Sequence, residues 1–322
     1  MPVIQITNTY TGAVADIVKA CVPDGFEART LPCNSTDALL EAVCDADYIL
    51  ASGRLRIDSS VLSRATRLKM IQRTGVGLDT LDMEAIRKAG IPLYVNSGVN
   101  SQSVAEHTIL LILACLRRLT EIDANSKIGI WQKQPQGITT YELCGKTVGI
   151  IGMGNIGKKV SSILKVFGAD VIYYDMQRSS PEEEERLNIK YTEIDDLFSK
   201  ADIVSLHCAL TDETRNIVNK RTLALMKDMA VIVNTARGQL IDEADLLDAI
   251  ETGKIAFAGL DVHAEEPYCE KDMLIRSRRV IATPHIGGVT YDSFRAMISN
   301  AMNNILMYEN GKTECIQKSR LL

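Results

Sequence analysis

The first hundred residues alternate short runs rich in β-branched residues with amphipathic helical stretches, and the same alternation begins again at Lys146. This alternation requires parallel sheets, because each helix carries the chain back to the edge where the next strand starts. We therefore expect an α/β fold with two doubly wound parallel sheets. Strands are expected at residues 3–6, 27–31, 48–51, 69–72, 92–95, 148–151, 171–174, 203–207, 230–234, 256–261 and 280–282.

Helical periodicity adds the connecting elements. A long helical pattern runs from about residue 103 towards 122, and residues 129–137, which include Pro135 and the only Trp, are expected to form a loop or linker. Residues 291–309 predict an amphipathic helix. The acidic run at residues 182–185 is expected to be a solvated helix face. Shorter helices are expected at residues 14–20, 38–43 and 83–89.

Composition excludes several classes of function. A chain of 322 residues is long enough for about two domains, and its net charge of -5 offers no overall positive field for nucleic acid or an anionic membrane. The longest apolar run, residues 109–116, is far shorter than the roughly 20 residues of a membrane span. The first residues show no secretion signal. Eight scattered cysteines without a C-x-x-C pair predict reduced, mostly buried thiols in a cytoplasmic protein with no metal site.

A glycine fingerprint carries the first functional signal. Gly152, Gly154 and Gly157 fit G-x-G-x-x-G between a predicted strand and a predicted helix, where Asn155 and Ile156 begin the helix. The glycines permit a tight turn, close approach of a pyrophosphate, and packing of the helix on the strand. Asp175 ends the next strand 18 residues after the last glycine (175 − 157), near the spacing expected of a ribose-binding acid. The segment predicts a dinucleotide site.

The same acid bears on the choice of dinucleotide. A carboxylate at position 175 accepts hydrogen bonds from ribose hydroxyls and repels a 2′-phosphate, which favours NAD over NADP. Arg178 and Ser179 follow closely and could tolerate the phosphate. The sequence therefore predicts NAD without excluding NADP.

Further motifs follow in a characteristic order: residues 73–79 (RTGVGLD), 104–107 (VAEH), 234–238 (NTARG), 260–267 (LDVHAEEP) and 283–288 (TPHIGG). Together with the fingerprint they resemble the NAD-dependent D-2-hydroxyacid dehydrogenase family, which includes D-3-phosphoglycerate dehydrogenases and hydroxypyruvate reductases. The resemblance covers nearly the whole chain. It implies a flavodoxin-like substrate domain, residues 1–100 and 290–322, around an inserted Rossmann NAD domain, residues 101–289. It also implies an active site in the cleft and a homodimer that uses the long helix after Ser101.

The resemblance assigns a catalytic trio. Reduction of a 2-oxo acid needs a proton donor and a cation besides the nicotinamide hydride. Of the four histidines, the resemblance selects His285 as the donor, with Glu266 beside it and Arg237 holding the substrate carboxylate and carbonyl. Taken singly, each residue also has a structural explanation. His285 could cap a strand end, Glu266 could be a surface charge on a loop, and Arg237 could pair with a nearby acid.

Other motif positions imply cofactor contacts. His207 and Asp261 each end a strand, and either a cofactor contact or a turn-capping role explains them; His107 is more typical of packing. His263 departs from the family pattern, where an aromatic is common, and its role is left open. The candidate cofactor-binding residues are Gly152, Gly154, Asn155, Ile156, Gly157, Asp175, His207, Thr235, Ala236, Asp261 and Gly287.

Substrate contacts are expected in the N-terminal part. Residues 75–77 present backbone N–H groups that suit a carboxylate, although a plain glycine turn also explains them. Ser97 stands where relatives often have Pro. Arg54 could meet a substrate phosphate or be a surface residue. The candidate substrate-binding residues are Ser52, Gly53, Val76, Gly77 and Asn100.

Two functions follow from these observations. The first is an oxidoreductase that transfers a hydride between NAD(H) and a D-2-hydroxy acid or 2-oxo acid pair. The second is a non-catalytic NAD(H)-sensing protein like the corepressors of this fold, which retain the same Arg, Glu and His. The compact chain favours the enzyme, and nothing in the sequence specifies the substrate side chain.

Overall fold

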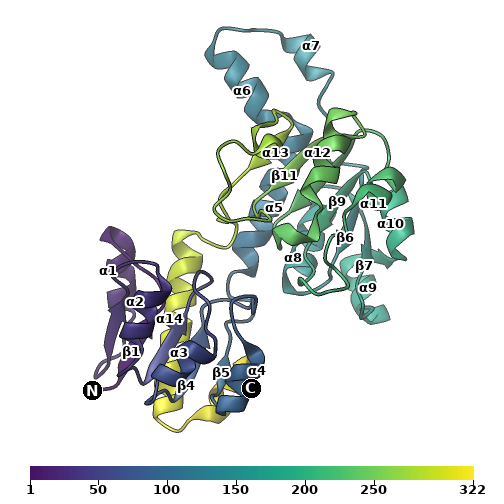
Figure 1. Ribbon diagram of the computed structural model, residues 1–322. Helices are drawn as coiled ribbons and strands as arrows, with labels where there is room; N and C mark the ends of the chain where they lie inside the picture. The colour runs from purple at the N-terminus through teal and green to yellow at the C-terminus, as the bar shows by residue number, and fades with distance from the viewer. The chain divides into compact units, whose positions relative to one another are not determined.

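The computed structural model describes all 322 residues, which form two compact units. Unit 1 contains Met1–Asn100 and Val289–Leu322, and unit 2 contains Ser101–Gly288 (Figure 1). Each unit has one sheet, and every paired strand in both sheets is parallel. The predicted α/β fold is therefore confirmed. None of the helices is long and apolar enough to cross a membrane.

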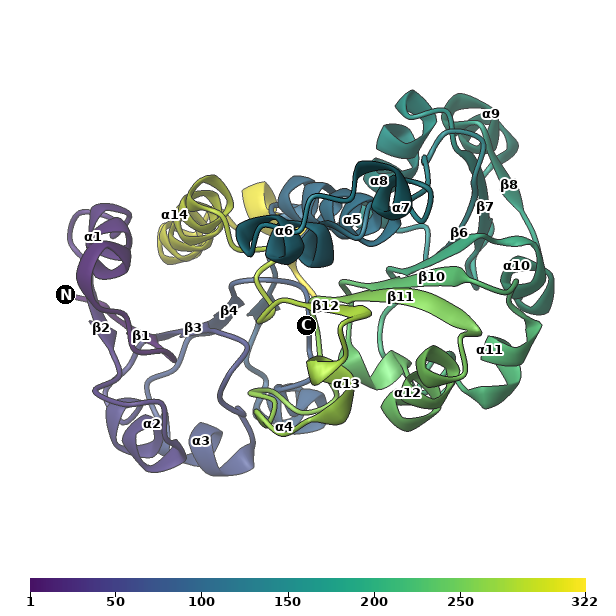
Figure 2. The same ribbon diagram turned by 90° about the horizontal axis from the view of Figure 1, so that it is seen from above.

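Unit 1 has the strand order β2-β1-β3-β4-β5, which is the flavodoxin-like order. Helices α1 and α14 cover one face and α2 and α3 the other, as Figure 2 shows. The elements are β1 (Val3–Ile6), α1 (Gly12–Ala20), β2 (Glu27–Thr30), α2 (Thr36–Ala42), β3 (Tyr48–Ala51), α3 (Ser59–Arg64), β4 (Met70–Arg73), α4 (Met83–Ala89), β5 (Leu93–Tyr94), α14 (Tyr291–Glu309) and η2 (Thr313–Ser319).

The returning helix α14 joins unit 1 through apolar and polar contacts. Ile298 and Ile305 pack in the core beneath the sheet, as the amphipathic pattern predicts. Asn304, which is 3% exposed, donates from Nδ2 to Oε1 of the fully buried Gln72 at 3.1 Å. The network continues to Asn96, whose Nδ2 donates to a carbonyl of α14 at 2.8 Å. Buried amides of this kind fix the position of a helix because each partner must be satisfied.

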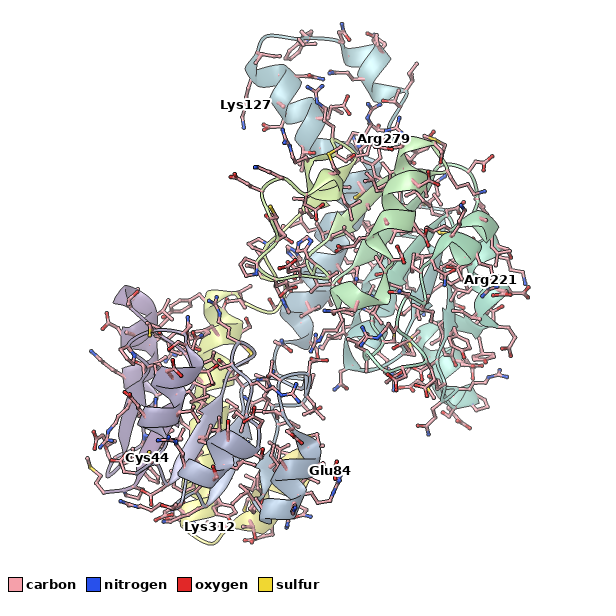
Figure 3. The ribbon with its side chains drawn as sticks, in the orientation of Figure 1. Cys44, Glu84, Lys127, Arg221, Arg279 and Lys312 are labelled. Atoms are coloured by element: carbon pink, nitrogen blue, oxygen red, sulfur yellow. The ribbon has the colours of Figure 1, made fainter.

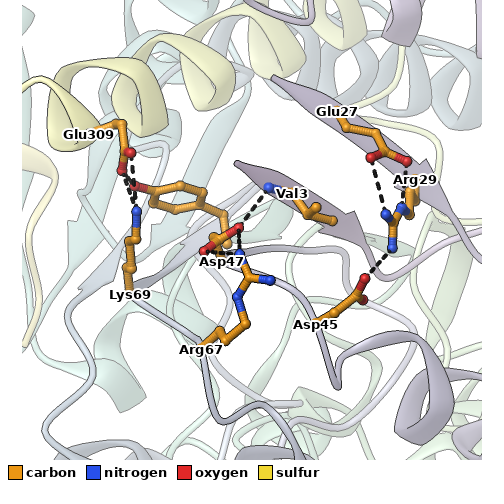
Figure 4. A network of polar contacts seen from close by, with 9 residues as sticks. Val3, Glu27, Arg29, Asp45, Asp47, Arg67, Lys69 and Glu309 are labelled. Atoms are coloured by element: carbon orange, nitrogen blue, oxygen red, sulfur yellow. Dashed lines mark hydrogen bonds and ion pairs between the residues drawn. The ribbon is translucent and has the colours of Figure 1, made fainter. Parts of the chain in front are cut away.

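An ion pair connects α14 with the amino-terminal edge of the sheet, where a second ion pair lies nearby (Figure 4). Lys69 donates from Nζ to Oε2 of Glu309, at the end of α14, at 2.9 Å. Nearby, the buried Asp47 carboxylate accepts the backbone N–H of Val3 at 2.9 Å and Nη2 of Arg67 at 3.0 Å. Lys69 thus connects the start of β4 with the C-terminal helix, and Asp47 connects the start of β1 with Arg67, although these residues are far apart in sequence.

Unit 2 has the strand order β12-β11-β10-β9-β6-β7-β8. Chain order reverses between β6 and β9, which creates the switch point at which Rossmann sheets bind ligands. The short strand β8 was not predicted, because an alternation over three residues is too short to indicate a strand. The strands are β6 (Thr147–Ile151), β7 (Asp170–Tyr174), β8 (Ile189–Tyr191), β9 (Ile203–Leu206), β10 (Ala230–Asn234), β11 (Ile255–Leu260) and β12 (Val280–Ala282).

Helices cover both faces of this second sheet (Figure 2). One face packs on α5 and α8, through residues such as Ile109, Ile112 and Leu164. The opposite face packs on α10, α11 and α12, through Leu197, Leu223 and others. The helices are α5 (Ser101–Leu116), α8 (Asn155–Val166), α9 (Pro181–Leu187), α10 (Ile194–Lys200), α11 (Lys220–Leu225), η1 (Gly238–Leu240), α12 (Glu243–Glu251) and α13 (Met273–Arg276).

One part of unit 2 differs from the sequence expectation. The long helical pattern is interrupted at Arg118, which has a φ of 50° and starts a separate helix, α6 (Leu119–Lys127). The apolar spacing continues across this break, so periodicity alone could not locate it. The expected loop at residues 129–137 contains a further short helix, α7 (Lys133–Gly137). Neither α6 nor α7 has a buried residue, and together they project from unit 2 as an arm (Figure 1).

The Asn304–Gln72 contact yields a stability prediction. Asn304→Ala leaves the buried Oε1 of Gln72 without this donor, and we expect the free energy of unfolding to fall by about 1–3 kcal/mol. Asn303 is exposed on the same helix, so Asn303→Ala is the matched control and should change stability by less than about 0.5 kcal/mol. Chemical unfolding of both variants measures the difference. Equal stabilities for the two variants would contradict a structural role for the buried amide.

Candidate active site

The candidate cofactor and catalytic residues lie in unit 2, on loops that follow parallel strands. Because the strands are parallel, their carboxyl ends meet at one edge of the sheet, where ligands bind in this architecture. The loop after β6 begins at Gly152, the loop after β9 at His207, and the loop after β10 at Thr235. The loops after β11 and β12 begin at Asp261 and Thr283.

The three fingerprint glycines have separate structural reasons. Gly152 has a φ of 100°, and a Cβ there would lie 2.4 Å from the backbone nitrogen of Cys208. A Cβ at Gly157 would lie 2.2 Å from the carbonyl oxygen of Gly152, so helix α8 packs directly on the loop. Gly154 is the N-cap of α8 and has no atom within 4 Å of a Cβ position, which leaves open backbone at the helix N-terminus. This open cradle fits the pyrophosphate of a dinucleotide.

Asp175 connects the fingerprint loop with the loop after β7. Its Oδ2 accepts the backbone N–H of Met153 at 2.6 Å, and its Oδ1 accepts that of Gln177 at 3.0 Å. The carboxylate is half-buried. It is therefore oriented beside the glycine loop, where ribose hydroxyls can add to its remaining lone pairs.

His207 follows β9 directly beside Gly152. Its Nε2 lies 2.9 Å from Oγ of Ser205, while Nδ1 is buried without a protein partner. Burial lowers the pKa of His207 to about 3, so the ring is neutral at physiological pH. A neutral ring at the switch point suits contact with a nucleotide and excludes His207 as a proton donor near pH 7.

Asp261 organises the loop that carries His285. Its buried Oδ1 accepts from Oγ1 of Thr283 at 2.6 Å and from the backbone of Ile286 at 2.9 Å, and Oδ2 accepts the backbone N–H of Gly287 at 2.8 Å. Burial acts to raise the pKa of Asp261, but hydrogen bonds from His107, Thr283 and these amides outweigh it and lower the pKa. The ionised carboxylate thus holds three residues of the turn, Thr283, Ile286 and Gly287.

His285 and Glu266 form the candidate proton relay. Nδ1 of His285 lies 2.8 Å from Oε2 of Glu266, and both side chains are partly exposed. His285 has a φ of 55°, held by hydrogen bonds from its backbone N–H to Asp261 and Thr283 carbonyls. Burial acts to raise the pKa of Glu266, but the imidazole bond and charge lower it overall. The arrangement fixes the proton on Nδ1, and Nε2 makes no protein hydrogen bond.

His263, whose role the sequence left open, supports the pair through its backbone. Its N–H donates to Oε1 of Glu266 at 3.1 Å. The buried imidazole packs on Tyr268, with ring centroids 4.7 Å apart, and Nε2 donates to the carbonyl of Thr283 at 3.1 Å. The imidazole of His263 makes no hydrogen bond to the Glu266 carboxylate.

Arg237 follows β10 in a turn shaped by Asn234. The fully buried Asn234 amide accepts from the backbone of Ala236 at 3.0 Å and donates to the carbonyl of Arg237 at 2.8 Å. Gly238 then approaches the next loop so closely that a Cβ would lie 1.9 Å from the carbonyl carbon of His263. The arginine loop and the loop leading to Glu266 are thereby packed together.

The candidate substrate residues lie in unit 1, at the carboxyl ends of β3, β4 and β5. Ser52 donates from Oγ to the carbonyl of Thr7 at 2.9 Å, and Val76 is 50% exposed. The buried Arg73 donates from Nε to the carbonyl of Gly77 at 2.7 Å and from its guanidinium to the carbonyl of Ser52. It thus connects the Ser52–Gly53 loop with the Val76–Gly77 loop. Asn100 is half-buried at the end of the unit.

Sequence reasoning missed the residues that support these loops. Thr283, Asn234 and Arg73 act through hydrogen bonds that residue spacing does not reveal. His107, expected to be a packing residue, lies 3.0 Å from Oγ1 of Thr283 and 3.4 Å from Oδ1 of Asp261 through Nε2. A polar residue directly after a buried strand, as at Thr283, is the one signal that could have suggested such a role.

The comparison with protein families decides the family. Residues 109–287 match the D-isomer specific 2-hydroxyacid dehydrogenase, NAD binding domain model. The chain belongs to this family of dehydrogenases. The match covers the glycine loop, Asp175 and the loops of Arg237, Glu266 and His285, and the description of the domain confirms NAD as the predicted cofactor.

Named relatives of this dehydrogenase chain differ in substrate. It is 36% identical to a glyoxylate reductase from Thermococcus litoralis over 279 residues, covering 85% of this chain and 84% of that protein. It is 38% identical to a D-3-phosphoglycerate dehydrogenase from Mycobacterium leprae over 294 residues, covering 91% of this chain and 54% of that protein. The chain therefore spans about half the length of the phosphoglycerate dehydrogenases that it matches.

Solved structures share the fold along nearly the whole chain. A D-lactate dehydrogenase from Aquifex aeolicus, complexed with NAD and lactic acid, matches with a TM-score of 0.87 and 27% identity, covering 99% of this chain and 98% of that one. The TT0316 protein from Thermus thermophilus matches with a TM-score of 0.86 and 32% identity, covering 96% and 97%. The flavodoxin-like and Rossmann orders of the two sheets agree with these matches.

The neutral His207 yields a prediction on pH. The folded protein keeps the ring neutral down to about pH 3, whereas the unfolded chain binds a proton near pH 6.5. The stability contributed by the neutral ring is therefore complete above pH 6.5 and is lost as the pH falls towards 3. At pH 5 we expect this loss to be about 2 kcal/mol.

Chemical unfolding at pH 7.5 and pH 5 measures this loss. His207→Gln keeps a group that can bond to Ser205 but does not titrate, so its decrease in stability between the two pH values should be about 2 kcal/mol smaller than that of the natural protein. The same decrease in both proteins would show that His207 is not held neutral by burial.

Proposed function

We propose that this chain is an NAD-dependent oxidoreductase that interconverts a D-2-hydroxy acid and a 2-oxo acid. The observation that carries the proposal is the 2.8 Å contact between His285 Nδ1 and Glu266, on loops at the same sheet edge as the open glycine cradle. A proton relay beside a dinucleotide site is what hydride transfer to a carbonyl requires. When bound, NADH supplies the hydride to the 2-oxo carbon.

The chain's own residues then supply the proton and the charge. His285 gives a proton from Nε2 to the oxygen that was the carbonyl oxygen, while Glu266 holds Nδ1 and stabilises the imidazolium before the transfer. In the oxidative direction Nε2 takes the proton back. Water then restores the protonation state of the partly exposed ring.

Arg237 serves as the cation of the reaction. A guanidinium binds a carboxylate by two parallel hydrogen bonds and polarises an adjacent carbonyl. The buried Asn234 amide fixes the turn that carries Arg237, and Gly238 packs against the loop leading to Glu266. These contacts support a constant spacing between Arg237 and His285. A substrate that contacts both side chains at once requires such a spacing.

We propose glyoxylate and hydroxypyruvate as the first substrates to test. The relatives that the chain matches over most of their length include glyoxylate reductases and a hydroxypyruvate reductase. In unit 1, the backbone N–H groups of Val76 and Gly77 would bind the substrate carboxylate, and Ser52, Gly53 and Asn100 would contact the remainder of the molecule. Arg73 would position these loops through the carbonyls of Ser52 and Gly77.

We also propose a homodimer built on unit 2. The α6–α7 arm buries none of its own residues and exposes Ile128, Trp131 and Ile138 by 73%, 89% and 81%. Exposed apolar side chains grouped in this way mark an interaction surface. A cavity of about 560 Å³ opens at the amino ends of β9, β10 and β11, where Leu116, Met229, Phe257 and Arg279 line it beside Ile138 of the chain's own arm. Figure 3 labels Arg279 at the end of unit 2 that carries the arm. We assign the arm of a second copy to this cavity.

The exposed cysteine thiols bear on the cellular compartment of the protein. All eight cysteines are free, and five of them are exposed, so the expectation of mostly buried thiols was wrong. Exposed thiols persist in a reducing environment. We therefore propose a cytoplasmic location.

The catalytic roles yield a kinetic prediction. We expect NADH oxidation with glyoxylate or hydroxypyruvate, and His285→Asn should lower kcat by about 10²–10⁴-fold because the proton donor is lost. Arg237→Ala should lower kcat/KM by at least about 10²-fold through loss of a bidentate contact. Stopped-flow absorbance at 340 nm follows the reaction, and calorimetry should show NADH affinity within about threefold of the natural protein in both variants.

The controls separate catalysis from sensing. Glu265→Gln changes the exposed carboxylate next to Glu266 and should leave kcat within about twofold. Tight NADH binding with no turnover of glyoxylate, hydroxypyruvate, phosphohydroxypyruvate, pyruvate or phenylpyruvate would show that the chain is an NAD(H)-sensing protein and not an enzyme. Full activity in His285→Asn would show that His285 is not the proton donor.

The arm yields a prediction on assembly. Trp131→Ala should weaken the dimer by at least about tenfold in Kd, because a buried tryptophan covers about 150–250 Å² of surface. Val166→Ala is the matched control, since Val166 is 86% exposed on α8, belongs neither to the arm nor to the lining of the cavity, and should leave the dimer unchanged. Sedimentation velocity over a concentration series measures both. A monomeric natural protein, or a Trp131→Ala dimer of unchanged Kd, would contradict the proposed interface.

A further inference from the structure

The loop after β7 carries both the carboxylate that favours NAD and an arginine that could favour NADP. Arg178 lies three residues beyond Asp175, within reach of the same ribose for a side chain of its length. A nearby arginine is the group that accommodates a 2′-phosphate in dinucleotide sites. The position of the Arg178 side chain therefore matters for the choice between NAD and NADP.

Arg178 is held by a carboxylate of the following helix. Its Nε donates to Oε1 of Glu184 at 2.8 Å, and its Nη2 donates to Oε2 at 2.9 Å, which is a bidentate pair. The guanidinium also lies over the ring of Tyr191, 5.2 Å from the centroid. The Nε–Nη2 side of the guanidinium, which could bind a phosphate by two hydrogen bonds, is thus directed towards α9, and its face lies against β8.

Glu184 is itself fixed by buried partners. The hydroxyl of Tyr173, on β7, donates to Oε1 of Glu184 at 2.7 Å and accepts the backbone N–H of Ser179 at 2.9 Å. Only 14% of the Glu184 side chain is exposed, compared with 61% for Arg178. The bond from Arg178, with that from Tyr173, lowers the pKa of Glu184 to about 2, so it is ionised at all physiological pH values.

A second cation near the fingerprint is held in the same way. Lys158 follows Gly157 in the first turns of α8, and its Nζ lies 2.7 Å from Oε2 of Glu183. The hydrogen bond from Lys158 lowers the pKa of Glu183. The run at residues 182–185, expected to be a solvated helix face, therefore neutralises two cations beside the dinucleotide site. Glu185 in the same run is exposed and has no ion-pair partner.

We propose that Glu184, supported by Glu183, determines cofactor choice by holding Arg178 away from the ribose, so that a 2′-phosphate meets only the carboxylate of Asp175. This proposal rests on the proposed dinucleotide-dependent function. A phosphate carries about 1.5–2 negative charges and must displace an ordered carboxylate to reach the guanidinium. Discrimination against NADP(H) therefore has two parts. Asp175 repels the 2′-phosphate, and Glu184 keeps the guanidinium of Arg178 from binding it.

The test uses the full chain and measures binding of NADH and NADPH by calorimetry. Glu184→Gln keeps an oxygen that can accept from Tyr173 but removes the charge that holds Arg178. We expect the affinity for NADPH to rise about tenfold while the affinity for NADH stays within about twofold. Glu185→Gln removes the same charge from the same helix without freeing a cation, and should change neither affinity.

Two further variants distinguish the release of Arg178 from a general increase in mobility of the loop after β7. Arg178→Ala in the Glu184→Gln background should abolish the gain for NADPH, and the gain should weaken as salt concentration rises. The comparison is repeated in the Asp175→Ser background, where repulsion of the phosphate is reduced. An unchanged NADPH affinity after Glu184→Gln in both backgrounds would overturn the proposal, whereas absence of NADH binding to the natural protein would instead overturn the proposed function.

Discussion

Asp261 is a buried carboxylate at the end of β11, and the geometry of the candidate relay depends on it. Each of its oxygens accepts hydrogen bonds from the turn that carries His285, including two backbone amides. A buried charge is tolerated only when its lone pairs are satisfied, so the turn and the carboxylate stabilise each other. This mutual requirement keeps His285 at a positive φ and within 2.8 Å of Glu266.

The fold was largely predictable because its signals are local. Alternating strands and helices predicted both parallel sheets, and the pattern at residues 291–309 coincides with α14. The break at Arg118 was not predictable, because the apolar spacing continues through it and a single left-handed residue leaves no periodic trace. The short strand β8 was missed because its pairing with β7 depends on tertiary contacts.

The candidate site was predictable only in part. Motif residues such as Gly152, Asp261 and His285 stand at or just after strand ends, which the alternation of elements locates. Residues that act through hydrogen bonds, such as Thr283 and Asn234, depend on loop conformations that spacing does not encode. The acidic run before β8 gave a misleading signal, because two of its carboxylates pair with cations from other elements.

The division of residues between the two units has an evolutionary consequence. The proposed chemistry uses loops of unit 2 alone, where Gly238 packs against His263 with no room for a side chain. The proposed substrate contacts other than that of Arg237 come from separate loops of unit 1, connected by Arg73. Mutation can therefore alter the shape of the substrate pocket without disturbing the catalytic backbone, and selection for a new 2-oxo acid can proceed through unit 1 while the chemistry is inherited unchanged.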